Sequence, residues 1–489
     1  MTLRIFNVLG RQKQNFQPLE EGRIGIYVCG PTVYDVAHLG HAKSYISFDM
    51  VVRWLRFSGY DVLYVQNITD VGHLTETETG EDKILKQARA LQAKPMQIVE
   101  TYTRSYFDDM DALGVQRPDI SPRASGHVPE QIKMIEELID KGFAYEVNGS
   151  VYFDVSEDED YGKLSNRRVE EQDEGVREEV RDEKRSPADF ALWKRAEPDH
   201  ILRWDSPWGE GFPGWHIECS AMAKKYLGAT FDIHGGGIDN IFPHNECEIA
   251  QSESANDAPF ANYWMLVGSL NVPDAFDGTP VKMSKSLGNF VSVKDALSVH
   301  RPEVIRLFTF SAHYSNPVTY SEEAIHAASA GWERLNNAYR LTRRQMETAP
   351  EGDAGNGFLE RVEKARADFT SAMNDDFNAP KAVATLQEFT RDVNSLLNGT
   401  VPVGLETLRA IHDVYAELGG DVLGILRPTD AAVNTDAKRE AGLIELLIQI
   451  RADARKNKDF ATSDRIRDEL SALGVTLEDR PDGTLWKAD

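Results

Sequence analysis

The sequence has little cysteine and no long apolar run. Its 489 residues include three cysteines, Cys29, Cys219 and Cys247, too few for a disulfide framework in a chain of this size. The opening MTLRIFNVLGRQKQ lacks the apolar core of a signal peptide, and no apolar run approaches the length of a membrane span. We therefore expect a cytoplasmic protein without membrane association. Each cysteine, taken alone, is more simply interpreted as a small buried residue than as a metal ligand.

Positive charge is also scarce. Lys and Arg total 54 against 79 Asp and Glu, which gives a formal net charge of −25. Because phosphate backbones are bound by Lys and Arg, this balance disfavours a nucleic-acid partner unless a specific motif or a local basic face indicates one. Apolar residues at 41% and charged residues at 27% are typical of a globular protein, and the length predicts three or four domains.

The first part of the chain alternates strand and helix patterns. Residues 22–30, GRIGIYVCG, predict a buried strand, and residues 41–57 carry apolar side chains at helical spacing, with Gly59 as a plausible stop. YDVLYVQNIT then predicts a second strand. Strand, helix and strand in this order form a βαβ unit, which implies a parallel sheet. Similar strand patterns return at FDIHGG (231–236) and NYWMLVGSL (262–270).

Other segments have a different character. Residues 83–142 are mainly helical in pattern, and the charged stretch 156–187 is interpreted as solvated surface within an insertion. After about residue 320 the pattern becomes helical. RADARKNKDFATSDRIRDEL (451–470) predicts a basic helix, and the following GVTLEDRPDGTLWK suits a small hairpin.

HLGH (38–41) lies where the first strand meets its helix. A helix start presents N–H groups and a partial positive charge, so anions bind there. His38 and His41 add donors that can follow the charge that moves onto phosphates, and Gly40 would let a flat base approach the backbone. Alone the motif is weak, because paired histidines often only cap or pack.

KMSKSLGN (282–289) is more specific. Its lysines, Lys282 and Lys285, suit a mobile loop that grips a triphosphate, the alternative being a solvated basic loop. HGGGID (234–239) follows another predicted strand; its glycines permit close approach by a nucleotide, and Asp239 can accept from ribose hydroxyls. HLGH and KMSKS together on a βαβ unit resemble the signature of class I aminoacyl-tRNA synthetases.

Two further segments, GWHIECS (214–220) and PHNECE (243–248), combine cysteine with histidine and acid. These are ligand types for tetrahedral Zn²⁺, although the spacing is not that of a C-x-x-C finger. Residue chemistry alone leaves too many candidates for one closed site: Cys29, His216, Cys219, His234, His244, Cys247 and Glu248.

Four stretches together resemble cysteinyl-tRNA synthetases: YVCGPTVYDVAHLGHA, PGWHIECSAM, FDIHGGGIDNIFPHNECEIAQ and KMSKSLGN. The resemblance runs from about residue 20 to the C-terminus. It implies an α/β fold with a Rossmann-like parallel-sheet catalytic domain over 1–320, including an insertion at about 120–205 and a KMSKS region at about 271–320. A helical-bundle anticodon-binding domain over 321–430 and a small mixed C-terminal domain over 431–489 would follow.

The resemblance also selects a metal site. It implies one Zn²⁺ per chain on four ligands, namely Cys29, Cys219, His244 and Glu248, with Cys247 at a non-ligand position. A thiophilic metal binds a thiolate far better than a hydroxyl, which would separate cysteine from serine where pocket size cannot. Thr69 and Trp215 are implied beside the bound amino acid.

The remaining implied sites concern ATP and tRNA(Cys). Mg-ATP would lie against Gly30, Thr32, His38, Gly40, His41, His234, Gly236, Asp239, Lys282 and Lys285, of which His38, His41, Lys282 and Lys285 would be catalytic. The positions that match base-reading residues are Arg455, Asp464 and Asp479. The implied partners are tRNA(Cys), ATP and L-cysteine, and the implied state is a monomer.

Three alternatives stay open at this point. A mycothiol-pathway ligase, which couples cysteine to an amino sugar-inositol, has a similar active site but lacks the full anticodon region. A non-catalytic RNA-binding paralogue would not need intact HLGH and KMSKS, and a zinc hydrolase would carry H-E-x-x-H rather than PHNECE. Two loops, 71–82 with His73 and 273–280, are longer than is usual in the family, with an effect that the sequence does not define.

Overall fold

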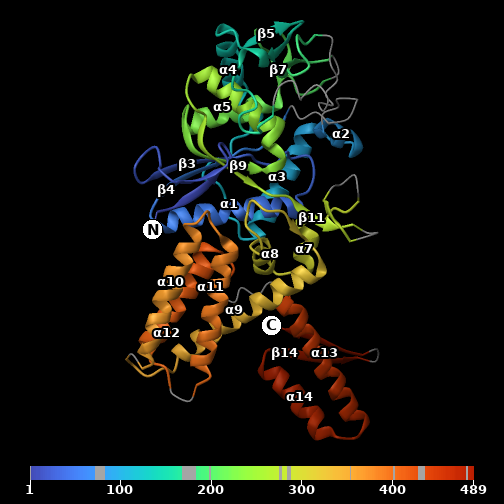
Figure 1. Ribbon diagram of the computed structural model, residues 1–489. Helices are drawn as coiled ribbons and strands as arrows, with labels where there is room; N and C mark the ends of the chain where they lie inside the picture. The colour runs from blue at the N-terminus through green and yellow to red at the C-terminus, as the bar shows by residue number, and fades with distance from the viewer. Residues whose placement is uncertain are drawn as a thin grey trace. The chain divides into compact units, whose positions relative to one another are not determined.

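The computed structural model describes residues 2–71, 83–167, 183–197, 200–274, 278–283, 288–352, 354–399, 402–427, 435–480 and 483–488 (Figure 1). The chain forms two compact units, Met1–Arg427 and Pro428–Asp489. Most of the long loop at 71–82, including His73, lies outside the described residues, as does Lys285.

A four-stranded parallel sheet organises the larger unit. Its order is β10 (Ala261–Val267), β9 (Phe231–Gly237), β3 (Arg23–Val28) and β4 (Asp61–Gln66). Helix α1 (Leu39–Phe57) connects β3 to β4, so the predicted βαβ unit is confirmed. The central strands β3 and β9 are buried on both faces over most of their length.

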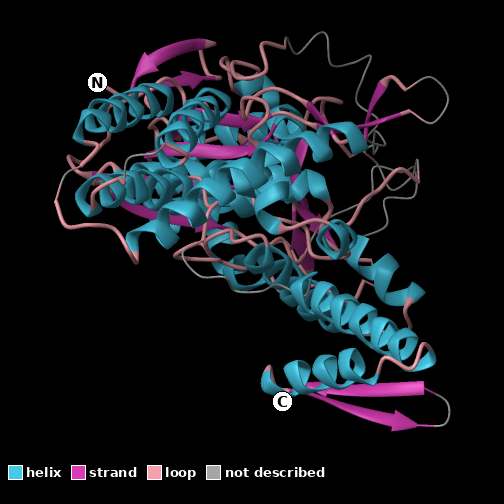
Figure 2. Cartoon of the chain, turned by 90° about the horizontal axis from the view of Figure 1, so that it is seen from below, coloured by secondary structure: helices cyan, strands magenta, loops and turns pink. Residues whose placement is uncertain are grey.

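Helices cover both faces of this sheet. Helix α1 lies on one side and α5 (Trp215–Leu227) on the other, with α6 (Glu246–Asn256) packed on α5 (Figures 1 and 2). Helix α1 ends before Gly59, which has a φ of 93° that favours glycine, as the sequence predicted. Helices α2 (Lys83–Ala90) and α3 (Pro95–Ala112) follow β4.

An antiparallel sheet interrupts the parallel one. Helix α4 (Val128–Asp140) precedes β5 (Ala144–Val147), β6 (Ser150–Phe153), β7 (Phe190–Arg195) and β8 (Gly211–Pro213), which pair in that order. This sheet has a core of its own, which includes Val151, Phe153, Leu192 and Trp193.

The charged stretch after β6 is not solvated throughout. Leu164 is 1% exposed, and the backbone N–H groups of Leu164 and Ser165 donate to the carboxylate of Glu246 at 3.2 and 2.7 Å. The interpretation of 156–187 as solvated surface was therefore wrong for this part, because its few apolar residues anchor it to α6. Residues 168–182 lie outside the described part of the chain.

The segment NYWMLVGSL was predicted as one strand but contains a break. β10 ends at Val267, and β11 (Leu270–Pro273) joins a separate sheet with β12 (Pro280–Lys282) and β13 (Val318–Thr319). The break falls at Gly268, where a Cβ would lie 2.5 Å from the carbonyl carbon of Asn316. The close approach of a second loop, which sequence periodicity cannot detect, thus ends the strand.

Near its start the larger unit has an antiparallel pair of strands, β1 (Arg4–Asn7) and β2 (Gln12–Asn15). Its part from residue 293 onward is mainly helical, as predicted beyond about residue 320. Its elements are α7 (Val293–Val299), α8 (Pro302–Thr309), α9 (Glu322–Met346), α10 (Leu359–Met373), α11 (Ala379–Leu397), α12 (Leu405–Asp413) and η8 (Val414–Val422). Arg306 of α8 joins this bundle to the sheet domain. Its guanidinium, 0% exposed, lies 2.6 Å from the carboxylate of Asp49 on α1 and donates to the carbonyl oxygen of Leu423.

The smaller unit contains α13 (Thr435–Lys456), α14 (Phe460–Ala472) and a hairpin of β14 (Val475–Arg480) and β15 (Gly483–Ala488). The hairpin was predicted, but the single basic helix over 451–470 was wrong. The chain breaks between α13 and α14, because Lys458 adopts a φ of 61° and the side chain of Asp459 accepts from the N–H of Thr462 to cap α14.

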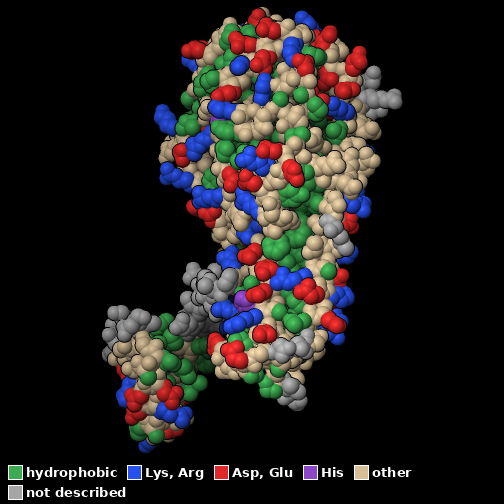
Figure 3. All heavy atoms as spheres, turned by 90° about the vertical axis from the view of Figure 1, so that its left-hand side faces the viewer, with side chains coloured by type: hydrophobic (Ala, Val, Ile, Leu, Met, Phe, Trp, Pro, Cys, Tyr) green, Lys and Arg blue, Asp and Glu red, His purple; other side chains and the backbone are tan. Residues whose placement is uncertain are grey.

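The surface of the larger unit mixes both charge signs. Figure 3 shows Lys and Arg interspersed with Asp and Glu over its visible face, without one extended basic region. Among the described helices, none has both the length and the apolar composition needed to cross a membrane.

Candidate active site

A cavity of about 340 Å³ opens at the carboxyl ends of β3 and β9, which is where open α/β sheets bind ligands. Its lining brings together most of the predicted site residues: Cys29, Gly30, Thr32, His38, Gly40, His41, Thr69, Trp215, Cys219, Gly236, Asp239, His244 and Lys282. The fold thus collects residues from HLGH, HGGGID, the start of KMSKS and the cysteine-histidine segments in one place.

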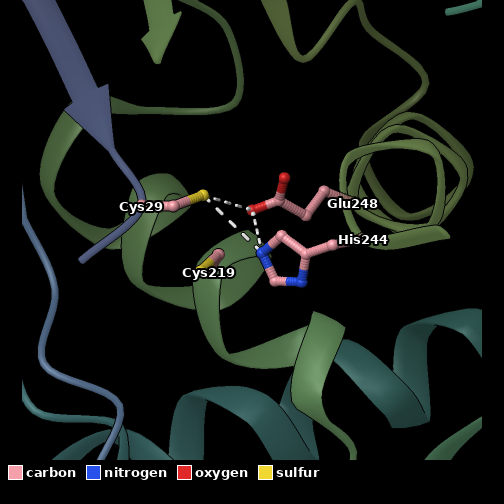
Figure 4. Close-up of side chains that lie close together, drawn as sticks. All are labelled: Cys29, Cys219, His244 and Glu248. Atoms are coloured by element: carbon pink, nitrogen blue, oxygen red, sulfur yellow. Dashed lines mark hydrogen bonds and ion pairs between the residues drawn. The ribbon is translucent and has the colours of Figure 1, made fainter. Parts of the chain in front are cut away.

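Four side chains converge at one end of the cavity (Figure 4). Cys29 follows β3, Cys219 lies in α5, His244 lies in the short η5 (Ile241–Asn245), and Glu248 is in the first turn of α6. One ligand atom from each lies within 4.8 Å of all the others. We refer to these residues as the four-residue cluster.

The donor set and spacing of the cluster fit a tetrahedral metal. The Cys29 Sγ is 3.6 Å from the His244 Nε2 and 3.8 Å from the Glu248 Oε1, and those last two atoms are 3.4 Å apart. A tetrahedron with metal–ligand bonds of about 2.0–2.3 Å has edges of about 3.3–3.8 Å. Two sulfurs, one imidazole nitrogen and one carboxylate oxygen form a set that suits zinc.

Neighbouring polar groups fix the orientation of the cluster. The His216 Nδ1 is 2.9 Å from the His244 Nδ1, on the side of the ring away from Cys29. The Asn245 side-chain amide donates to the Glu248 Oε2 at 2.7 Å, and the His234 Nε2 is 3.2 Å from that oxygen. His216 and His234 thus contact ligand-type residues from behind, an arrangement that stabilises metal sites.

His234 does not lie where it was expected, whereas Cys247 does. The His234 ring is 0% exposed, stacks on Trp264 at 4.1 Å and does not line the cavity, although it was predicted to contact ATP. Cys247 lies outside the cluster, with its Sγ 3.5 Å from the hydroxyl of Tyr161. This placement agrees with a small buried thiol at residue 247.

The electrostatics of the cluster favour a bound cation. A hydrogen bond with Cys29, burial and nearby negative charge raise the pKa of the Cys219 thiol. Burial alone would raise the pKa of Glu248, but the charges of His234 and His244 lower it well below its usual range. A divalent cation would replace the thiol protons and compensate the buried carboxylate.

The cavity walls beside the cluster are held by a ring contact and by hydrogen bonds. The Trp215 ring lies 4.4 Å from the His244 ring, and Thr69 accepts through Oγ1 from the Asn67 amide at 3.1 Å. The same Asn67 accepts from the Gly30 N–H at 2.7 Å. A Cβ at residue 30 would lie 1.6 Å from the Asn67 carbonyl oxygen, so only glycine fits. Sequence reasoning missed Asn67, whose one signal was a polar residue directly after a buried strand.

The HLGH histidines start α1. His38 is its N-cap: its Nδ1 accepts from the His41 N–H at 3.2 Å, and the His41 Nδ1 accepts from the His38 N–H at 3.3 Å. The rings stack at 3.9 Å. Because both Nδ1 atoms accept, the proton of each neutral ring resides on Nε2, which makes Nε2 the donor.

The segment after KMSKS is bonded to this helix start. Leu39 donates from its N–H to the Val291 carbonyl oxygen at 3.1 Å, and Val293 donates to Ala37 at 3.0 Å. Lys282 pairs with Asp239 at 2.9 Å, with side chains 59% and 57% exposed. The two residues that were predicted for triphosphate and ribose therefore contact each other.

The smaller unit holds the three predicted base-reading residues. Arg455 pairs with Asp479 at 2.8 Å, while Asp464 lies 3.4 Å from Arg467. Asp479 also accepts two hydrogen bonds of 2.7 Å from Arg451, which together with its other partners lower its pKa. Sequence reasoning missed Arg451, which lies one helical turn before Arg455.

The geometry agrees with comparisons to known proteins. Residues 15–330 match the family described as the catalytic domain of tRNA synthetases class I (C), so the fold and cavity are those of a class I aminoacyl-tRNA synthetase. Residues 368–427 match the DALR domain, and residues 443–486 match the cysteinyl-tRNA ligase anticodon binding domain.

Curated relatives identify the family within this class of synthetases. Cysteine–tRNA ligases of Chlorobium luteolum and Deinococcus radiodurans are 50% and 49% identical to this chain, over 99% of its length and 99% and 96% of theirs. The corresponding protein of Thermus thermophilus is 46% identical over 100% of both chains. The chain belongs to the cysteine–tRNA ligase family.

Solved structures support the fold. Methionyl-tRNA synthetase of Mycobacterium tuberculosis, solved with methionyl-adenylate, has a TM-score of 0.56 at 15% identity, covering 82% of this chain and 89% of that one. A putative arginyl-tRNA synthetase of Campylobacter jejuni has a TM-score of 0.55 at 13% identity, covering 84% and 94%. At these identities the likeness concerns the fold alone.

Proposed function

We propose that this protein joins L-cysteine to tRNA(Cys) at the expense of ATP. The observation that carries the proposal is the shared cavity, in which Cys29, Cys219 and His244 of the four-residue cluster and the HLGH histidines line one space of about 340 Å³. A cysteine whose thiol points to the cluster would have its carboxylate directed along the cavity toward the helix start that binds phosphate.

The reaction would take two steps. A carboxylate oxygen of cysteine attacks the α-phosphorus of Mg-ATP, and the bond to the β-phosphate oxygen breaks to release pyrophosphate. The Nε2–H groups of His38 and His41, with Lys282 and Lys285, would stabilise the added negative charge on the phosphoryl oxygens. In the second step a terminal tRNA hydroxyl, the 2′-hydroxyl in class I enzymes, attacks the carbonyl carbon and AMP leaves.

We propose zinc as the metal of the cluster. Cys29, Cys219, His244 and Glu248 would hold it, and it would supply affinity for a thiolate over a hydroxyl, as discrimination against serine requires. Thr69 and Trp215 would orient the rest of the amino acid from the cavity wall. Arg455, Asp464 and Asp479 are proposed to read the anticodon, and the ion pairs of Arg455 with Asp479 and of Asp464 with Arg467 would have to rearrange on binding.

Cysteine-dependent ATP–pyrophosphate exchange, with serine as the control, tests the first step. Acceptor tests with tRNA(Cys) and with an amino sugar-inositol then separate the synthetase from the mycothiol-type ligase. The match of residues 443–486 to an anticodon-binding domain favours tRNA. Zinc-loaded protein that catalyses no exchange would refute the enzyme, and transfer to the sugar alone would refute the tRNA assignment.

The remaining expectations are a monomer that works in the cytoplasm. The monomer rests on the family resemblance and the location on the sequence composition, and sedimentation of the purified protein with and without tRNA(Cys) tests the first of them.

A further inference from the structure

Lys43 is a buried cation that the proposed reaction does not use. It follows HLGH within α1, is 1% exposed, and donates from Nζ to the carbonyl oxygens of Gly268 at 2.5 Å, Asn316 at 3.1 Å and Tyr314 at 3.2 Å. No carboxylate pairs with it among the residues that the structure describes. Burial lowers the pKa of Lys43 to about 8. The groups that stabilise its positive charge are the dipoles of the three carbonyl groups.

The three carbonyl groups come from two loops that pack backbone to backbone. Residues 267–270 line the same cavity as the HLGH histidines, whereas residues 313–316 are not among its lining residues. The Gly268 N–H donates to the Tyr314 carbonyl oxygen at 2.9 Å. A Cβ at residue 268 would overlap the backbone of Asn316, so the loops 267–270 and 313–316 are in direct contact. Lys43 donates to carbonyl groups of both loops and so fixes their separation.

The loop 313–316 is anchored at its other side to the helical bundle. The Tyr314 hydroxyl donates to the Asp376 Oδ1 at 2.9 Å, and the His313 Nε2 is 2.8 Å from the Asp376 carbonyl oxygen. Asp376 and Phe377 have φ values of 68° and 51° between α10 and α11, a conformation that is strained for residues other than glycine. The loop is therefore held between α1 and a rigid turn of the bundle.

We propose that Lys43 is a positioning residue for the nucleotide, because its ammonium group holds the cavity wall of residues 267–270 at a set distance from the HLGH histidines. Lys43 does not line the cavity itself and acts through the backbone of Gly268. The inference rests on the proposed function, since it takes the ligand of this wall to be ATP. Small displacements of such a wall are costly, because phosphoryl transfer depends on alignment within about 1 Å.

Lys43→Met tests the proposal, because methionine keeps the length of the side chain and removes its donors. We expect the Kd for ATP, measured by calorimetry, and the KM for ATP in pyrophosphate exchange to rise about 10-fold. The KM for cysteine should stay within about two-fold, since neither Lys43 nor the carbonyl groups that it binds belong to the four-residue cluster.

Lys141→Met is a control at a second lysine that binds backbone carbonyl groups. The Lys141 ammonium donates to Ser254 and Ala255 at the end of α6 opposite to Glu248, and it differs from Lys43 in being more exposed and in pairing with Asp257. It should leave the KM for ATP unchanged. If both substitutions raise the KM for ATP and the KM for cysteine alike, Lys43 has only a structural role and the proposal is overturned.

Tyr314→Phe provides a milder variant that removes one hydroxyl from the loop. We expect a rise of about three-fold in the Kd for ATP, and less than additive effects when it is combined with Lys43→Met, because both act through one loop. Tyr415→Phe, which removes an equally buried hydroxyl bonded to Thr390, is its control.

The ATP-binding measurement decides the inference independently of the proposed reaction. An unchanged Kd for ATP in folded Lys43→Met or strictly additive effects in the double variant would overturn it. Normal ATP binding without cysteine-dependent exchange in the unsubstituted protein would count against the proposed function alone, and a raised Kd in Lys43→Met would still support the role of Lys43.

Discussion

The two ends of the cavity are built in opposite ways. At the cluster end, Cys29, Cys219, His244 and Glu248 are 8%, 2%, 1% and 0% exposed, and further polar groups hold them from behind. At the end where we propose that phosphates bind, which we call the phosphate end, Lys282 and Asp239 are more than half exposed and pair with each other. One end is part of the protein core, and the other lies at the surface.

This difference matches the functions that we propose for the two ends, recognition of a thiol by a metal at one and binding of ATP at the other. Recognition of a thiol by a metal requires ligands that keep one geometry, so the ligand set is buried and braced. Binding and release of a triphosphate require groups that change partners readily. An exposed ion pair contributes about 0–1 kcal/mol, so Lys282 can exchange Asp239 for a phosphate at small cost.

Metal removal should have the largest effect on activity and should act only at the cluster end of the cavity. Chelation followed by dialysis is expected to reduce cysteine-dependent exchange by more than about 100-fold and to lower the melting temperature, because a ligand of the native state is lost. ATP binding, measured by calorimetry, should stay near that of the untreated protein. As the control, added zinc should restore cysteine-dependent exchange. Full exchange in protein shown to be metal-free would contradict the proposed role of the cluster end.

His38→Asn should come next, at the phosphate end. Loss of one donor to a developing charge lowers kcat by about 10²–10³-fold. Because asparagine is a good N-cap, the start of α1 and the melting temperature should be preserved, whereas His38→Ala should also cost about 1 kcal/mol of unfolding free energy. Exchange rates and urea unfolding measure both quantities. Unchanged kcat in His38→Asn would remove His38 from the mechanism.

His234→Gln tests whether the histidine behind Glu248 serves the cluster or the nucleotide. The structure predicts metal affinity weaker by about 10–100-fold, measured by competition with a chelating dye, with the KM for ATP unchanged once metal is saturating. A raised KM for ATP with full metal content would restore the original prediction that His234 contacts the nucleotide.

Asp239→Asn should have the smallest effect. Loss of an exposed ion pair should change the free energy of unfolding by less than about 1 kcal/mol. The KM for ATP should change only a few-fold, through one lost acceptor for ribose. Lys282→Met is the comparison, and it should raise the KM for ATP more than Asp239→Asn does. If Asp239→Asn lowered the free energy of unfolding by several kcal/mol, the phosphate end of the cavity would also belong to the protein core.

Much of the fold could be predicted, because the βαβ pattern of β3, α1 and β4 and the stop at Gly59 are local signals. The break between α13 and α14 was missed because residues 451–470 contain few large apolar side chains and so provide no periodic signal for a stop. The break at Gly268 was missed for another reason. It depends on Asn316, distant in sequence, and periodicity is a local property.

The candidate site shows the same limit. Ligand-type residues were evident, but seven candidates remained until the family resemblance selected four. His234 illustrates why: β9 is buried on both faces, so alternation does not tell which side chains point to the cavity. Lys43 gave no signal at all, because a lysine near a helix start normally lies in solvent, and only the folded chain brings three carbonyl groups to it.

The contact between Gly30 and Asn67 has a consequence for the mutational landscape of this protein. The Asn67 carbonyl oxygen occupies the space of any Cβ at residue 30, and the Asn67 side chain binds both the Gly30 N–H and Thr69. In a saturation library selected for growth, residue 30 should tolerate glycine alone although it has no side chain to contribute. Substitutions that alter the amino-acid preference would then have to arise elsewhere on the cavity wall, because residues 30 and 67 could not change.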